Sequence, residues 1–146
     1  MFKAALVLRG MDRKRLGDKL PDQGFCILLG ALAAWNEALL CALKTAAIPF
    51  PRLYESGVRY EREPYPREEW TDAAETAARG FGDCEDLACW RVAELRVEGI
   101  DARPGFVRRR VLTQMGWQTI YHIVVLYPTG QIEDPSKHLG MNSIEV

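Results

Sequence analysis

The stretch Gly80–Asp86, Gly-Phe-Gly-Asp-Cys-Glu-Asp, places a cysteine at the first turn of a predicted helix, directly after a glycine turn. Unpaired backbone N–H groups and the positive end of the helix dipole favour Cys84 as a thiolate, and the same groups can hold an oxyanion. The three neighbouring carboxylates act against this, because their charge raises the pKa of a nearby thiol. Two of them also fit a structural role, with Asp83 as N-cap and Asp86 as the N3 partner of a capping box. A reactive Cys84 therefore needs a nearby imidazolium.

Downstream of this stretch, a helix is predicted over Cys84–Val97 and is followed by strands. Three apolar residues follow Cys84 at helical spacing and share its face: Ala88, Val92 and Leu95. Gly99 ends the helix. Apolar and β-branched runs then predict three strands, the last two joined by a turn at 128–130: Ala102–Thr113, Trp117–Tyr127 and Gln131–Asp134. Helices first and an antiparallel sheet second predict an α+β domain.

Upstream, Gln23–Ala47 is predicted as a helix that is apolar almost all round, which suits packing on several sides. Cys26 and Cys41 lie within it, where cysteine behaves as a small buried hydrophobe. Four cysteines without paired spacing indicate a reducing compartment rather than a disulfide or zinc scaffold. The other segments are predicted as a strand, a connector, a long loop and a short helix capped by Thr71: Phe2–Leu8, Met11–Asp22, Ile48–Pro66 and Arg67–Arg79.

The chain of 146 residues is long enough to bury a core as one domain, 1–146, and its formal charge is −1. This balance gives no excess of positive charge for phosphate binding, so nucleic acid is not an expected partner. The basic run Arg108–Arg110 is interpreted as the solvated side of a strand. The apolar region Phe25–Leu43 falls short of a clean membrane span, and Met1–Gly10 lacks the features of a signal peptide. Neither export nor a membrane partner is expected.

Two histidines are candidates for the base. His122 lies in an apolar strand, where an unpartnered histidine would cost stability, whereas His138 lies in a polar tail. Asp134 follows His122 by twelve residues, across the predicted turn. Adjacent antiparallel strands would bring these two together, so that Asp134 accepts from one imidazole nitrogen while the other faces Cys84. This is the geometry of nucleophile, base and orienter.

Several motifs in a fixed order carry a family resemblance: Gly82–Asp86 opening a helix, then Gly99–Arg103, then His122 in a strand and Asp134-Pro135 after a turn. This order resembles the transglutaminase-like superfamily, and in particular the bacterial transglutaminase-like cysteine proteases. Trp70-Thr71 also fits, so the resemblance covers about residues 70–141. The closing run Ile132–Met141 is similar to the small phage-encoded members and suggests a phage or prophage origin.

The resemblance implies a papain-like fold, in which the cysteine lies at the N-terminus of a helix packed against the sheet that bears the other two residues. Cys84 is then the nucleophile, His122 the general base and later acid, and Asp134 the orienter. The Cys84 amide is one candidate oxyanion donor, and Trp70 or Gln23 is the other.

Calcium is the one cofactor that the resemblance suggests. Some of the related proteases bind it through acids that flank the cysteine, and Asp83 and Asp86 occupy those positions. Capping is the alternative role for both acids. Residues 1–69 do not match the family pattern, so they leave substrate specificity open.

The leading prediction is thiol-dependent cleavage or acyl transfer at an amide of a protein or peptide, in the cytoplasm of a bacterial host. The rival is a phage virion component, at the neck or tail, that binds phage structural proteins and keeps the fold with or without activity. A metal module of Cys84, Cys89 and His122 is disfavoured, because cysteines five residues apart on a helix do not face together.

Overall fold

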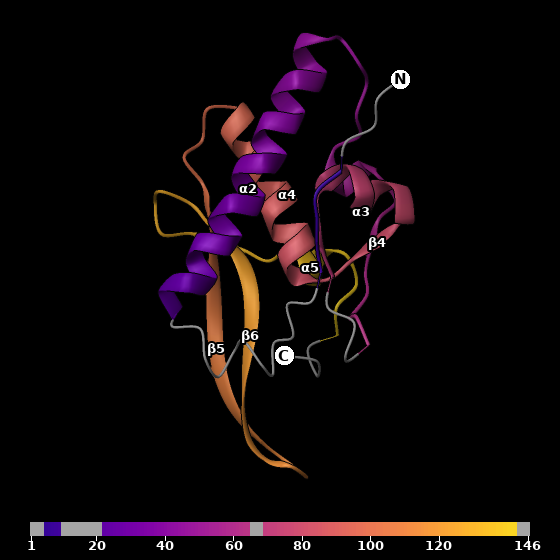
Figure 1. The fold of residues 1–146 in the computed structure, drawn as a ribbon. Coiled ribbons are helices and arrows are strands. Elements are labelled where there is room, and N and C mark those ends of the chain that lie inside the picture. The colour runs from indigo at the N-terminus through magenta and orange to yellow at the C-terminus, as the bar shows by residue number, and fades with distance from the viewer. Residues whose placement is uncertain (1–4, 10–21, 65–68, 143–146) are drawn as a thin grey trace.

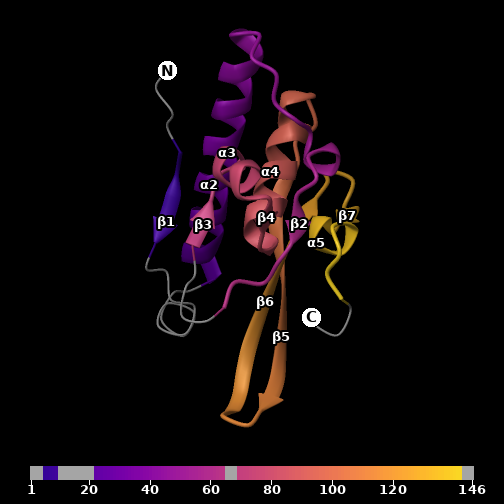
Figure 2. The ribbon, with the colours of Figure 1, turned by 90° about the vertical axis from the view of Figure 1, so that its right-hand side faces the viewer.

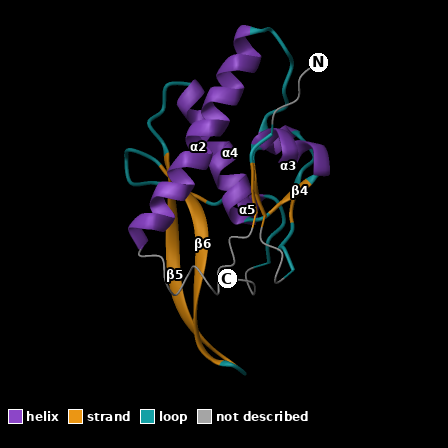
Figure 3. Ribbon diagram, viewed as in Figure 1, coloured by secondary structure: helices purple, strands orange, loops and turns teal. Residues whose placement is uncertain are grey.

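The computed structural model describes residues 5–9, 22–64 and 69–142. Its elements in chain order are β1 Val7–Arg9, α2 Asp22–Thr45, the 3₁₀ turn η1 Leu53–Glu55, β2 Arg59–Tyr60, β3 Glu69–Thr71, α3 Ala73–Arg79, β4 Phe81–Gly82, α4 Cys84–Val97, β5 Arg103–Thr113, β6 Gly116–Leu126, β7 Ile132–Glu133 and α5 Pro135–His138. The protein is thus a mixed α and β chain, compatible with the expected α+β class (Figure 3).

A three-stranded antiparallel sheet forms one layer, in the order β5–β6–β7, and α2 and α4 lie across one of its faces (Figure 1). β5 and β6 pair along their whole length, while β7 adds a short third strand with Glu133 opposite Val125. Ile123 and Val125 belong to the core cluster beneath the two helices. Because side chains alternate along a strand, His122 and Val124 point to the face of β6 opposite to Ile123 and Val125.

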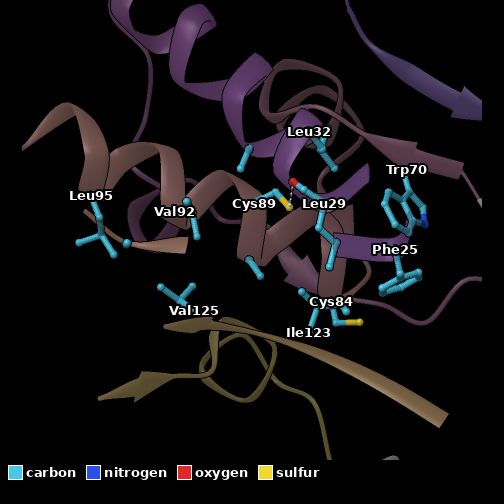
Figure 4. Packing of buried hydrophobic residues seen from close by; sticks show 13 residues of the cluster. Phe25, Leu29, Leu32, Trp70, Cys84, Cys89, Val92, Leu95, Ile123 and Val125 are labelled. Carbon is cyan, nitrogen blue, oxygen red and sulfur yellow. Dashed lines mark hydrogen bonds between the residues drawn. The ribbon is translucent and has the colours of Figure 1, made fainter. Parts of the chain in front are cut away.

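The α4 helix is the central element of the fold. Its bounds, Cys84–Val97, are those predicted, and eleven of its fourteen residues are buried. The helix face predicted to be apolar packs in the core cluster that α4 shares with α2 and the sheet (Figure 4). Its residues are Cys84, Ala88, Val92 and Leu95. The opposite side, with Leu87 and Trp90, packs in a second cluster with Leu53 and Val58. A helix buried on both sides is a stable support for the residues at its N-terminus.

The α2 helix forms as predicted but is not packed on several sides. One face packs on α4 and β5, and the outer face is exposed, so the expectation that Cys26 and Cys41 are buried is wrong. The sequence is apolar on both faces, and the outer one bears small residues together with Ile27 and Trp35, which are 71% and 38% exposed. By length and composition alone, Gln23–Thr45 is apolar enough to cross a membrane, where the region Phe25–Leu43 was expected to fall short.

The N-terminal part of the described chain is joined to residues 69–72. β1 pairs antiparallel with β3, so the predicted strand Phe2–Leu8 is observed at residues 7–8 and continues to Arg9, while its residues 2–4 lie outside the described part. The predicted helix Arg67–Arg79 is wrong at residues 69–71, which form β3. The helix there begins only at Ala73, and its N-cap is Asp72 rather than Thr71. Asp72 also accepts hydrogen bonds from the Leu6 amide and, at 2.9 Å, from the indole of Trp35.

Two further predictions concern irregular segments. The connector Met11–Asp22 lies outside the described residues, except that Asp22 begins α2. The predicted loop Ile48–Pro66 contains η1 and the short strand β2, which pairs parallel with β4. This pairing fixes the glycine turn that precedes Cys84, because β4 is Phe81-Gly82.

The hairpin of β5 and β6 extends well beyond the helices and forms a two-stranded arm (Figure 2). Its inner half belongs to the core, where Tyr121 stacks on Phe25 of α2 and Phe106 meets the same ring edge-on. Its outer half ends in the turn between Thr113 and Gly116.

Candidate active site

Cys84 is the first residue of α4, directly after the glycine turn. Asp83 is the N-cap and Asp86 completes a capping box, so the predicted capping roles are confirmed. Gly80 adopts the left-handed conformation, with φ of 82°, as the C-cap of α3. A side chain at position 82 would come within 3.0–3.1 Å of atoms of Thr76, Asp86 and Leu87. Glycine is therefore needed at position 82 for the turn to approach the start of α4 so closely.

Asp86 holds the elements around Cys84 together. Its carboxylate is fully buried and accepts from the amide of Thr71 at 2.8 Å and from that of Asp83 at 3.1 Å. Arg79 donates to it at 2.8 Å. Burial, and then the charge of Glu85, raise the pKa of Asp86 well above its usual value, against the lowering effect of these donors. Asp86 thus connects β3, α3 and α4.

His122 and Asp134 form the hydrogen-bonded pair that the sequence predicted for a general base and its orienter. His122 Nε2 lies 2.8 Å from Asp134 Oδ2. Asp134 follows β7 and is the N-cap of α5, where it accepts from the Lys137 amide at 3.3 Å. Asp134 directly precedes α5, and α5 contacts both β6 and α4, so the pair lies beside the place where these elements meet. A carboxylate at this place fixes the orientation of the ring and leaves Nδ1 as the nitrogen for proton transfer.

The pKa of Asp134 gives a prediction on acid stability. Partial burial raises this pKa, but the hydrogen bond and charge of His122 lower it more, so the net shift is downward. A carboxylate whose pKa is lowered on folding stabilises the protein above its unfolded value of about 3.9, and this stabilisation is lost as the pH falls through the folded pKa. We expect Tm, measured by circular dichroism, to fall more between about pH 5 and pH 2 in the wild type than in Asp134→Asn. Equal losses in the two proteins would contradict this.

Cys84 meets the strand that carries His122 through the hydrophobic core. The thiol packs in the core cluster that contains Ile123, the residue after His122 (Figure 4). It donates to Glu85 Oε2 at 3.2 Å. Only 3% of Cys84 and 7% of His122 are exposed. The structure therefore pairs the predicted base with its orienter and places the nucleophile beside the same strand.

The three candidate oxyanion donors differ in their surroundings. The Cys84 amide donates to Asp83 Oδ1 at 2.7 Å, so it is already engaged. Trp70 is buried in the same cluster as Cys84, and its indole N–H has no acceptor among the protein atoms of the described chain. Gln23 is exposed in the first turn of α2, two residues before Phe25, whose ring meets Trp70 edge-on. Of the two side-chain candidates, Trp70 is the one that belongs to the same cluster as the thiol.

A group of potential metal ligands lies at the same helix end, and its members differ from the predicted pair Asp83 and Asp86. Ligand atoms of Asp83, Cys84 and Glu85 lie within 4.8 Å of one another. Asp86 is instead occupied by its three donors, so it is less suited than Glu85 to the predicted calcium role. Hard carboxylate oxygens suit calcium, whereas the thiol does not. Cys89 is buried and donates to the Leu29 carbonyl at 3.5 Å, away from the ligand group of Asp83, Cys84 and Glu85, which does not fit a metal module of Cys84, Cys89 and His122.

Glu133 is a supporting residue that the sequence analysis missed. It accepts from Tyr54 at 2.6 Å, from Tyr127 at 2.5 Å and from Arg91 of α4 at 2.7 Å. Partial burial raises its pKa, but these donors lower it more. Because Glu133 precedes Asp134, this network fixes the strand end that carries the orienter. An acid at the end of an apolar strand was the available signal.

No family model, curated protein or solved structure matches this chain. The interpretation of the site therefore depends on its own geometry and on the motifs of the sequence.

Proposed function

We propose that the chain is a cysteine-dependent amide hydrolase of the transglutaminase-like type, with a papain-like arrangement of Cys84, His122 and Asp134. The observation that carries the proposal is the hydrogen bond of His122 Nε2 to Asp134 Oδ2 at 2.8 Å, on the strand against which the cysteine-bearing helix packs. A histidine held by a carboxylate through one nitrogen is oriented to serve as a base through the other.

The reaction follows from these roles. The Cys84 thiolate attacks the carbonyl carbon of a protein or peptide amide, and the bond to the amine breaks as the His122 imidazolium gives its proton to the leaving nitrogen. A thioester at Cys84 remains. His122 then takes a proton from water, which attacks the thioester and releases the acid and the thiol. An amine in place of water gives transamidation through the same acyl-enzyme.

The ground-state contacts set a condition on this mechanism. The Cys84 thiol donates to Glu85 in the present conformation, so its side chain must turn toward His122 Nδ1 before the ion pair forms. The helix N-terminus stabilises the resulting thiolate, and its charge is then balanced by the imidazolium. The imidazolium is necessary because the negative charges of Asp83 and Glu85, on either side of Cys84, disfavour the thiolate.

Alkylation of Cys84 tests the proposal without a known substrate. In a Cys26→Ser/Cys41→Ser background, the exposed thiols are gone and only the two buried ones remain. Brief iodoacetamide treatment across pH 5 to 9, read by mass spectrometry, should label Cys84 rapidly near pH 6. His122→Ala should slow this labelling on the order of 10- to 100-fold, because an ordinary thiol is mostly protonated there.

Two internal controls sharpen this measurement. Cys89 should stay unlabelled, because burial, and then the charges of Asp86 and Glu85, raise its pKa well above the usual value. His138→Ala should leave the rate at Cys84 unchanged, since this histidine is exposed and stacks on Tyr54. Slow labelling of Cys84 that is indifferent to His122→Ala would refute the Cys–His pair.

A non-catalytic role as a phage virion component is the second candidate. The observation in its favour is the burial of Cys84, 3% exposed, with its thiol directed to Glu85. Slow labelling of Cys84, together with stoichiometric amounts of the protein in purified particles, would support this role. A particle-free protein that cleaves a phage or host protein would exclude it.

A further inference from the structure

The outer half of the β5–β6 hairpin exposes an unusual set of large apolar side chains. The described chain has eight exposed large hydrophobic residues, and four of them lie within residues 107–117. Exposed fractions are 42% for Val107, 68% for Leu112, 80% for Met115 and 64% for Trp117. Such a concentration on one projecting arm indicates a contact surface rather than scattered exposure.

The same arm is strongly basic. Residues 107–117 contain three arginines and no aspartate, glutamate or lysine, which gives +3. The whole chain carries −1, so the remainder carries −4 (−1 minus +3). The near-neutral total therefore conceals a local excess that is complementary to an anionic surface.

The order of apolar and basic residues along the arm matches the depth profile of a lipid interface. Leu112 and Trp117 are opposite each other next to the turn, and Arg110 lies two residues further back, with its guanidinium 5.5 Å from the Trp117 ring centre. At a rise of about 3.4 Å per residue, Arg110 is roughly 7 Å and Arg108 roughly 14 Å behind the Leu112 pair. Apolar and indole groups at the tip with arginines just behind them suit the acyl boundary and the headgroup layer of a bilayer.

The shape of the arm also favours a membrane over a protein groove. The tip is convex and projects from the body (Figure 2). A fluid bilayer accommodates such a tip from all sides, whereas a protein partner would need a matching deep cavity. Thr113, Gln114 and Gly116 at the turn carry no charge, so insertion desolvates no ion there.

From these features we infer that the tip of the β5–β6 hairpin, residues 107–117, inserts into the interface of an anionic lipid membrane and holds the protein at its surface. This attachment differs from the expected absence of a membrane partner, which rested on the apolar region Phe25–Leu43 falling short of a membrane span and on Met1–Gly10 lacking the features of a signal peptide. It is independent of the proposed hydrolase activity.

Vesicle binding tests the inference with the full chain. Co-sedimentation with vesicles of phosphatidylglycerol and phosphatidylcholine is expected at low salt, and little binding is expected to phosphatidylcholine alone. Leu112→Ser/Met115→Ser should weaken binding at least about tenfold, because apolar area no longer enters the interface. Arg108→Gln/Arg110→Gln should weaken it by about 30-fold, from about 1 kcal/mol for each basic residue near the surface.

Fluorescence locates the inserted residue. Trp117 is expected to shift its emission to shorter wavelength when anionic vesicles are added, and Trp117→Phe should remove most of the shift. Trp70 and Trp90 are buried in the core and should contribute little. Circular dichroism of each variant establishes that the fold is retained.

Matched variants decide between the hairpin and other contacts. Ile132→Ser removes an exposed apolar residue outside the tip and should leave binding unchanged. Loss of binding with Ile27→Ser but not with the tip variant would place the contact on α2 and overturn the inference. Absence of binding to both kinds of vesicle would also overturn it, as would a dimer in light scattering that the tip variant dissociates, because the occupant would then be a second copy of the chain.

Discussion

Asp134→Asn is expected to lower the rate of acyl-enzyme formation at Cys84 by about 10³- to 10⁴-fold. The asparagine amide occupies the position of a carboxylate oxygen that lies 2.8 Å from His122 Nε2. An amide N–H there favours the wrong imidazole tautomer, and the equivalent change in a serine hydrolase triad costs about 10⁴-fold. The burst of nitrophenol released from p-nitrophenyl acetate measures acylation without a known amide substrate.

Asparagine is the informative replacement at this position because it keeps the structural role. Asp134 caps α5, and asparagine is an equally good N-cap, so the helix start should be preserved. Asp101→Asn, at an exposed aspartate between α4 and β5, is the matched control and should leave the burst unchanged. An Asp134→Asn protein with a normal burst would mean that His122 is not oriented through this bond.

Asp86→Ala is expected to lower the free energy of unfolding by about 3 to 5 kcal/mol, the usual cost of removing one partner of a buried ion pair. The change strands the buried amides of Thr71 and Asp83 and leaves Arg79 with Glu63 as its carboxylate partner. Urea unfolding followed by circular dichroism measures the loss.

Two comparisons give this value its meaning. Asp86→Asn keeps an acceptor for the Thr71 amide but loses the charge and the Oδ2 acceptor of the Asp83 amide and Arg79, so its stability should fall between those of wild type and alanine. Glu61→Ala, at an exposed acid, should change stability by less than about 0.5 kcal/mol. A loss below about 1 kcal/mol for Asp86→Ala would show that the connection between β3, α3 and α4 is held by other contacts.

Local signals were sufficient for the central helix and for half of the site. The glycine turn, the capping acids and Gly99 fix both ends of α4 within the chain itself. The His122–Asp134 pair was also predictable, because a short turn sets the register between two antiparallel strands. Both cases depend on interactions between residues close in sequence.

Long-range contacts explain what the sequence did not indicate. Residues 69–71 form a strand because they pair with β1, about 60 residues earlier in the chain. The local sequence pattern does not predict a pairing with so distant a segment. The outer face of α2 is as apolar as the inner one, so periodicity alone does not tell which face is covered. The direction of the Cys84 thiol likewise depends on Glu85, which sequence reasoning counted only as an opposing charge.

The pairing of β1 with β3 sets the order of events while the chain leaves the ribosome. Val7 pairs with Thr71 and Arg9 with Glu69, so the partners are 60 to 64 residues apart (69 − 9 and 71 − 7). At about 5 to 20 residues per second, the ribosome takes roughly 3 to 13 seconds to supply the second strand. The α2 helix, made in between, forms within about a microsecond once its residues are free. The first strand to emerge therefore waits for its partner beside a helix that is already complete.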